Sequence, residues 1–257
     1  MHVRNVPPLA SHQAHNQRAL IARWQIVARA VGLRVRILTE LDGEKILYLE
    51  TPQRGKEAAV DYLSAGVHGD EAGAVWGLLN WAESNLQQLI TGSFLIFPCF
   101  NPAGLRNNTR MDHRGLDINR RFDLAQDPIT APWRKLVSKR KLRIGLCLHE
   151  DYDSLGCYVY ELCQLKLSLS SQIMTECTQQ IPIDPRRVIE GNRAQAGIIR
   201  RSKLPPNFSG MPEAFVLWQL GCPITLTFET PSEFSLDDRV AAQAAFIAAA
   251  LRPAPPP

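Results

Sequence analysis

His68 and Glu71 are spaced so that both side chains can bind one metal ion. They lie in the segment 66–71 (GVHGDE), which follows an apolar run and precedes a helical pattern. At a strand-to-helix junction, a neutral imidazole and a carboxylate three residues apart can converge on one point, and both groups are common zinc ligands. The alternative is a loop histidine beside a glutamate that complements the positive end of the helix dipole.

A second histidine, His149, follows the apolar run 144–148 (IGLCL) and opens the polar group His149-Glu150-Asp151. A third metal ligand is expected at such a strand end. His149 comes 78 positions after Glu71 (149 − 71). A short spacer followed by a long one is typical of catalytic zinc sites, which keep three protein ligands and one open position. The alternative is a histidine hydrogen-bonded to a backbone carbonyl.

Glu229 ends another apolar run, 224–228 (ITLTF). The carboxyl ends of parallel strands meet at one edge of a sheet, so Glu229 is expected beside His68 and His149. A carboxylate next to an open zinc position can take a proton from water and pass it to a leaving amine. A salt bridge at a strand end is the alternative.

Arginines are concentrated in two long segments without a clear helix or strand pattern. The segment 101–128 opens with the motif NPAG and contains Arg106, Arg110, Arg114, Arg120 and Arg121. Guanidinium groups bind carboxylates in bidentate fashion and, near a zinc ion, can stabilise an oxyanion. The segment 181–209 contains Arg186, Arg187, Arg193, Arg200 and Arg201, which would suit an acidic substrate side chain. In both segments a solvated surface is the alternative.

The elements that must position these residues are predicted as alternating strands and helices. Apolar periodicity predicts a helix over 20–31, and an Asp-Gly turn at 42–43 predicts a hairpin near a sheet edge. Strands are expected at 60–67, 94–97, 144–148, 158–162 and 224–228, and helices at 71–89, 132–141, 168–180, 212–220 and after Ser235 to 251. The alternation predicts an α/β fold: a three-layer α/β/α sandwich with a mixed, largely parallel central sheet.

The composition is that of an ordinary globular protein. Among 257 residues, 45% are hydrophobic and 21% charged, and 29 Lys+Arg against 25 Asp+Glu give a formal net charge of +4 without a run of five like charges. This distribution argues against a nucleic-acid binder. No apolar stretch approaches the length of a membrane span and no secretory signal is evident, so we expect a cytoplasmic protein with no membrane partner.

No internal repeat or linker divides the chain, so one domain is expected over 1–257, with 253–257 as a flexible tail. Loops as long as 101–128 and 181–209 are usually functional. The six cysteines are Cys99, Cys147, Cys157, Cys163, Cys177 and Cys222. None forms a C-x-x-C pair, and we expect buried, reduced thiols rather than disulfides or a zinc knuckle.

Taken together, the segments from 60 to 235 resemble the zinc carboxypeptidase family of the carboxypeptidase A type, including its bacterial murein peptide amidase and D,L-peptidase branches. The resemblance rests on an ordered set: His-x-x-Glu, Asn-Pro-x-Gly, an arginine, Asp-x-Asn-Arg, a strand-end histidine and a strand-end glutamate. It implies that His68, Glu71 and His149 bind Zn²⁺ and that Glu229 is the general base and acid. By the same resemblance Arg110 polarises the scissile carbonyl, while Asn119 and Arg120 hold the carboxylate of the substrate.

Two features depart from the family pattern. The family usually has a mobile tyrosine before the catalytic glutamate, yet no tyrosine occurs between Tyr160 and Glu229. Arg121 stands where the family often has a second asparagine, which puts the shape of the carboxylate pocket in question.

The sequence therefore predicts a zinc-dependent hydrolase that cleaves an amide bond near a free carboxylate in a peptide. One alternative is a deacylase of small N-acyl amino acids, similar to succinylglutamate desuccinylase and aspartoacylase, which share the Gly-x-His-Gly-x-Glu segment. Another is a non-catalytic module that binds a peptide C-terminus, although such proteins usually lose a metal ligand or the base. The sequence does not indicate an oligomeric state.

Overall fold

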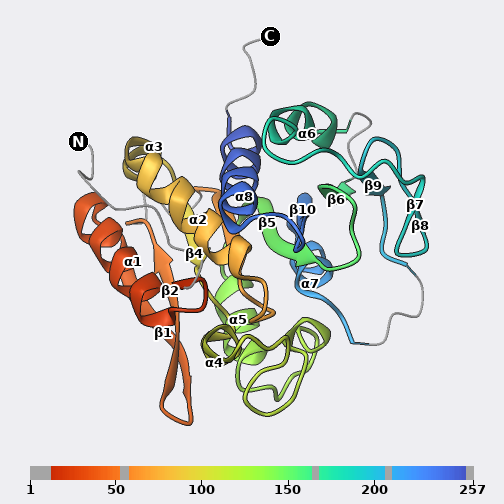
Figure 1. Ribbon diagram of the computed structural model, residues 1–257. Coiled ribbons are helices and arrows are strands. Elements are labelled where there is room, and N and C mark those ends of the chain that lie inside the picture. The colour runs from red at the N-terminus through yellow and green to blue at the C-terminus, as the bar shows by residue number, and fades with distance from the viewer. Residues whose placement is uncertain (1–12, 53–57, 164–167, 206–209, 253–257) are drawn as a thin grey trace.

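An eight-stranded sheet forms the centre of the protein in the computed structural model, which describes residues 13–52, 58–163, 168–205 and 210–252 (Figure 1). The strand order is β1-β2-β4-β3-β5-β10-β6-β9. The strands are β1 (Arg34–Leu41), β2 (Glu44–Glu50), β3 (Val60–Ala65), β4 (Phe94–Phe97), β5 (Leu142–Asp151), β6 (Tyr158–Cys163), β9 (Ile198–Arg201) and β10 (Ile224–Pro231). A separate two-stranded ribbon joins β7 (Val188–Ile189) and β8 (Asn192–Arg193).

The sheet is mixed, with a parallel centre. β4, β3, β5 and β10 run parallel to their neighbours in this order, β9 runs parallel to β6, and the pairs β1–β2, β2–β4 and β10–β6 are antiparallel. The β1–β2 hairpin turns at Asp42 and Gly43, which both have positive φ, and β1 lies at the edge of the sheet as predicted. Because β3, β5 and β10 are parallel neighbours, their carboxyl ends lie at one edge.

Helices pack on both faces of the sheet, which gives the predicted three layers. The helices are α1 (Gln17–Val31), α2 (Ala72–Ser84), α3 (Leu86–Thr91), α4 (Pro102–Asn107), α5 (Thr130–Val137), α6 (Ser170–Cys177), α7 (Glu213–Gln219) and α8 (Leu236–Ala250). One apolar core contains buried residues of α1, α2, α3, α6 and α8, and a second core contains those of α5 and α7. The α/β fold class expected from the sequence is therefore confirmed.

Three parts of the chain differ from the expected elements. The helix expected over 71–89 is two helices, because Asn85 leaves the helical conformation and its side chain donates to the carbonyl of Trp81 (2.8 Å). The segment 101–128 contains α4 and a short 3₁₀ helix, Ile118–Arg120. The segment 181–209 contains β9, a strand of the main sheet. The arginines of β9 interrupt the apolar pattern by which a strand would be recognised in the sequence.

The remaining helices and the cysteines agree with the sequence expectations. The remaining helices occur where expected, with ends shifted by a few residues, and Ser235 caps α8 by accepting from the N–H of Asp238 (3.1 Å). All six cysteines are free and buried, as expected. The expected tail 253–257 lies outside the described residues. Within the described part of the chain, no helix is both long enough and apolar enough to cross a membrane.

Candidate metal centre and substrate cavity

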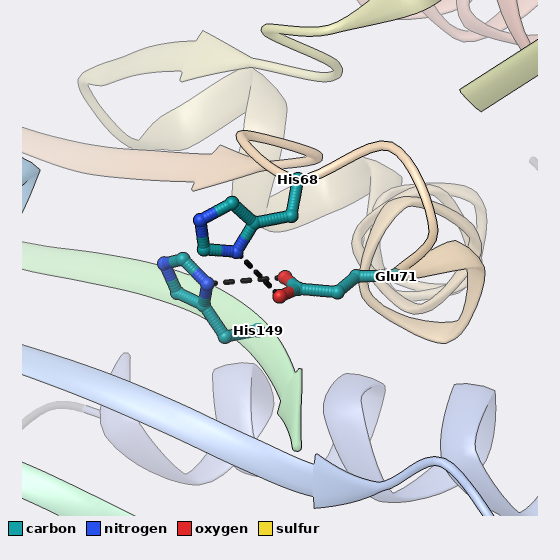
Figure 2. A group of neighbouring side chains, drawn as sticks. All are labelled: His68, Glu71 and His149. Atoms are coloured by element: carbon teal, nitrogen blue, oxygen red, sulfur yellow. Dashed lines mark hydrogen bonds and ion pairs between the residues drawn. The ribbon is translucent and has the colours of Figure 1, made fainter. Parts of the chain in front are cut away.

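His68, Glu71 and His149 reach one point from three elements. His68 lies in the loop after β3, Glu71 immediately precedes α2, and His149 lies near the carboxyl end of β5. Glu71 occupies the cap position of α2, yet its side chain makes no capping hydrogen bond. Its carboxylate instead points to the two histidines, as Figure 2 shows. The structure thus brings together the three residues that the sequence predicts as metal ligands.

The three side chains lie close enough to share one ion. Nδ1 of His68 is 2.5 Å from Oε1 of Glu71, and Nδ1 of His149 is 3.0 Å from Oε2. Atoms that could serve as ligands, one from each residue, all lie within 4.8 Å of one another. All three residues are buried, so these polar groups have little access to water.

For the pKa values of Glu71 and His68, charge interactions within this group outweigh the effect of burial. Burial alone would raise the pKa of Glu71, but the imidazoles of His68 and His149 lower it to about 2. Burial alone would lower the pKa of His68, but the carboxylates of Glu71 and Asp117 raise it to about 9. The carboxylate is therefore ionised, and a metal ion would take the place of protons on the imidazoles.

This donor set fits a divalent metal ion. Two imidazoles and one carboxylate are the three-ligand set of many catalytic zinc sites, in which a fourth position stays open. Oε2 of Glu71 is buried and lacks a partner with good hydrogen-bond geometry in the described part of the chain. The same three residues line a large cavity, so the open position of such an ion would face the cavity.

Asp117 holds the ring of His68 from the other side. Nε2 of His68 donates to Oδ1 of Asp117 (3.2 Å), and the guanidinium of Arg110 donates to Oδ2 (3.1 Å). Burial would raise the pKa of Asp117, but its partners His68 and Arg110 hold it below the usual value. A carboxylate bonded to the second ring nitrogen fixes the orientation of a ligand histidine. The sequence alone gives Asp117 no role, although its position in the Asp-x-Asn-Arg motif is a signal.

The motif Asn-Pro-x-Gly ties the segment of Arg110 to the loop of His68. The backbone N–H of Asn101 donates to the carbonyl of Gly66 (2.8 Å), and the Asn101 side chain donates to the carbonyl of Arg110 (3.2 Å). At Gly69 a Cβ atom would lie only 2.0 Å from the carbonyl carbon of Gly104. Glycine at 69 is therefore needed for the close approach of these two segments.

Glu229 is adjacent to His149 in the sheet. The two residues are register partners in the parallel pair β10–β5, so their side chains leave the same face of the sheet. Burial raises the pKa of Glu229 well above its usual value, helped by Glu71 and opposed by His149. A carboxyl group with a perturbed pKa beside a candidate metal site is a candidate for proton transfer.

The cavity next to the metal ligands is large enough for one or two amino-acid residues, with a volume of about 560 Å³. Arg110, Asn119, Arg120 and Glu229 all line it. The side-chain oxygen of Asn119 accepts from the N–H of Glu213 (2.9 Å), which leaves its NH₂ group as the end that can donate into the cavity. Arg120 is exposed, and its guanidinium donates to the carbonyl of Asn119 (3.1 Å).

Glu150, next to His149 in the sequence, has a supporting position. Its buried carboxylate forms an ion pair with Arg239 of α8 (2.8 Å) and accepts from the N–H of Gly73 in α2 (2.9 Å). Gln243 of α8 donates to the carbonyl of His149 (2.7 Å). These contacts fix the end of β5 against α2 and α8, so Glu150 helps to hold the neighbouring His149 in position.

The two departures from the family pattern concern Arg121 and the tyrosines near the cavity. Arg121 pairs with Asp127 (2.7 Å) and is not among the residues that line the cavity. Three tyrosines line the cavity: Tyr152, Tyr158 and Tyr160. The hydroxyls of Tyr158 and Tyr160 donate to Asp151 and Glu190, whereas Tyr152 is exposed at the turn after β5.

Comparisons with known proteins agree with this fold. Residues 60–162 match the catalytic domain of succinylglutamate desuccinylase and aspartoacylase. A protein from Shewanella amazonensis, provisionally named a metallopeptidase, has a similar structure, with a TM-score of 0.80 and 22% identity over 92% of each chain. Carboxypeptidase A from Helicoverpa armigera has a TM-score of 0.67 and 13% identity, covering 91% of this chain and 71% of its own.

A metallo-carboxypeptidase from Pseudomonas aeruginosa, in complex with (2-guanidinoethylmercapto)succinic acid, has a TM-score of 0.55 and 17% identity, covering 89% of this chain and 68% of its own. The comparison with curated proteins found no match. At these identities the structural likeness shows the fold, and the sequence match covers the segments of the three candidate ligands. The chain therefore has the carboxypeptidase-like α/β fold, and a His-Glu-His group that could hold a metal ion lies in the segment that matches the desuccinylase/aspartoacylase catalytic domain.

Proposed function

We propose that this protein is a zinc-dependent hydrolase that removes a residue with a free carboxylate from a peptide. The observation that carries the proposal is the arrangement around one cavity. A His-Glu-His group, a carboxyl group with a raised pKa at Glu229 and the pair Asn119 and Arg120 all line it. Together they provide a metal site, a proton acceptor and donors for a carboxylate.

Zinc is the proposed metal because two imidazoles and a carboxylate form its usual catalytic donor set. When bound, it would polarise the scissile carbonyl and increase the acidity of a water molecule. His68, Glu71 and His149 would hold the ion, and Asp117 would keep the ring of His68 in place through its hydrogen bond (3.2 Å).

Other residues of the chain supply proton transfer and charge stabilisation. Glu229 would accept a proton from the attacking water and return it to the leaving amine, because it is the register partner of His149 and lines the same cavity as the candidate ligands. Arg110 lies 3.3 Å from Nδ1 of His68 and would donate hydrogen bonds to the carbonyl oxygen as negative charge develops there. The NH₂ group of Asn119 and the guanidinium of Arg120 would bind the carboxylate of the leaving residue.

The second candidate is a deacylase of N-acyl amino acids, which the match of residues 60–162 favours. Such a substrate also carries a carboxylate near the scissile amide, so the same residues would serve both reactions. The two candidates differ in what lies on the acyl side of the bond: a peptide in one and a small acyl group in the other. A non-catalytic peptide-binding module is the third candidate, although such proteins usually lose a metal ligand or the base and this chain has all four candidate residues.

Hydrolysis assays with matched substrates separate these candidates. We expect the zinc-loaded protein to cleave short peptides with a free C-terminus faster than N-succinyl or N-acetyl amino acids. Faster cleavage of the N-acyl amino acids would support the deacylase instead. Binding of a peptide without hydrolysis of any substrate would support the binding module and contradict the proposal.

Peptides with free and amidated C-termini test the carboxylate donors. Arg120→Ala should weaken binding of free peptides and have little effect on amidated ones. Arg110→Ala should lower kcat for both, by up to about 2.7–4 kcal/mol of transition-state stabilisation if it acts as an oxyanion donor. Equal effects of Arg120→Ala on the two kinds of peptide would contradict its assignment as the carboxylate clamp.

A further inference from the structure

The wall of the cavity is one face of four neighbouring strands. Glu229 and Thr227 of β10 pair with Tyr158 and Tyr160 of β6 in the register of the sheet. Alternate residues of a strand share a face, so this face continues into β9. There Ile199 is the register partner of Tyr160, and Arg201 is the register partner of Leu162. All of these residues line the cavity.

Arg201 lies at the far end of this wall from the metal ligands. Its register partner Leu162 pairs with Thr225, which lies four residues before Glu229 in β10. At a rise of ~3.3 Å per residue, this places the backbone of Arg201 about 13 Å along the strand direction from that of Glu229. A residue bound with its scissile bond near Glu229 would extend its side chain into the space between them.

The guanidinium of Arg201 is held without a carboxylate partner. It donates to the side-chain oxygen of Asn192, whose NH₂ group in turn donates to the carbonyl of Glu190 (2.8 Å). Within the described residues, no carboxylate oxygen lies within 4.0 Å of it, so no ion pair neutralises its charge. A partly buried cation in this situation gains free energy from an anionic ligand.

The other arginines of the segment 181–209 are in different situations. Arg186 pairs with the buried Asp184 (2.6 Å), and Arg200 pairs with the buried Glu161 (2.9 Å). Arg187 and Arg193 are exposed and are not among the residues that line the cavity. Of these five arginines, Arg201 is therefore the one that faces the substrate cavity.

We propose that Arg201 is the specificity-determining residue of this cavity and binds the side-chain carboxylate of an acidic leaving residue. This inference rests on the proposed function, in which Asn119 and Arg120 bind the main-chain carboxylate of the same residue. Besides Glu71 and Glu229, five acidic residues line the cavity: Glu150, Asp151, Asp153, Glu161 and Glu190. Glu150 and Glu161 pair with Arg239 and Arg200, Asp151 and Glu190 accept from Tyr158 and Tyr160, and Asp153 lies at the exposed turn after β5. A basic leaving residue would instead be attracted to these carboxylates, so a preference for a basic leaving residue is the opposite outcome of the test.

Pairs of peptides that end in Glu or Gln, and in Asp or Asn, isolate the charge of the leaving side chain. The wild-type protein should hydrolyse the acidic member of at least one pair with a kcat/KM about tenfold higher or more. Arg201→Gln should bring this ratio close to one. Arg201→Glu should shift the preference to a peptide that ends in Lys. The matched control, Arg187→Gln, removes an exposed arginine from the same segment and should keep the wild-type preference.

Calorimetry with the metal-free protein gives a second measurement that does not depend on hydrolysis. A peptide ending in Glu should bind more tightly than its Gln counterpart to the wild type, and equally to Arg201→Gln. Equal hydrolysis and equal binding of acidic and neutral peptides by the wild type would overturn the role of Arg201 while leaving the proposed function intact. If the peptides bind with the predicted preference but are not hydrolysed, the proposed function fails and the role of Arg201 as an acid-binding residue remains supported.

Discussion

Asp117 connects two residues with different proposed roles. Its two carboxylate oxygens bond to the ring of His68 and to the guanidinium of Arg110, at 3.2 Å and 3.1 Å. One side chain therefore orients a candidate metal ligand and a candidate oxyanion donor. A change at this position should affect metal binding even though Asp117 is not itself a ligand.

We expect Asp117→Asn to weaken zinc binding by roughly 10–100-fold, because the loss of a carboxylate behind a ligand histidine has effects of that size. Competition with a chelator measures the affinity. Asp153→Asn is the matched control, since Asp153 lines the same cavity but makes no contact with a candidate ligand. Equal zinc affinities of the two variants would show that Asp117 does not support His68.

Glu229→Gln should retain zinc and the fold while lowering kcat by on the order of 10² or more, the usual effect of losing a general acid–base group. The amide is similar in shape but cannot accept and return the proton. Rates measured on zinc-loaded protein, together with the zinc content of the variant, separate a loss of chemistry from a loss of metal. Nearly normal turnover would exclude Glu229 as the base.

At the scale of the elements, the site depends on how α2 and α8 hold the ends of β5 and β10. The carboxylate of Glu150 bonds to Gly73 of α2, Arg239 of α8 and Thr230 of β10. Gln243 of α8 donates to the carbonyl of His149 and to the hydroxyl of Thr230. These buried contacts join four elements directly behind the candidate ligands.

Arg239→Met should lower the free energy of unfolding by on the order of 3 kcal/mol, because it leaves the fully buried Glu150 carboxylate without its cation. Denaturant titration of metal-free protein measures the change. Arg252→Met is the control, because Arg252 forms an exposed ion pair with Glu176 beyond the end of the same helix. A similar loss of stability in both variants would contradict the importance of the buried pair.

The sequence indicates most of these elements because their apolar patterns are regular. The runs that become β3, β4, β5, β6 and β10 are recognisable, and so are the hairpin and the capped helix α8. The break at Asn85 and the strand β9 are not recognisable in the sequence, since each depends on contacts that a local pattern does not contain. β9 ends in Arg200-Arg201, which lie on opposite faces of the sheet. Arg200 pairs with Glu161 on one face and Arg201 lines the cavity on the other, so the strand accommodates both arginines.

At the scale of the whole molecule, the cavity combines segments that are far apart in the sequence. His68 follows β3, His149 and Glu229 come from two later strands, and Asn119 and Arg120 come from the long segment between them. The order of motifs predicts that His68, His149 and Glu229 lie close together, because parallel strands bring their carboxyl ends together. The role of Asp117 and the position of Arg201 required the three-dimensional arrangement, since they depend on side-chain directions and on partners elsewhere in the chain.

The zinc content of purified protein, combined with anomalous X-ray scattering from its crystals, tests directly whether the chain holds zinc at the proposed site. We expect one zinc ion per chain, with His68, Glu71 and His149 at bonding distances of about 2.0–2.2 Å. His68→Ala and His149→Ala should lose the ion. Full zinc content in these two variants, or a zinc ion bound at a different site in the wild type, would contradict the assignment of His68, Glu71 and His149 as zinc ligands.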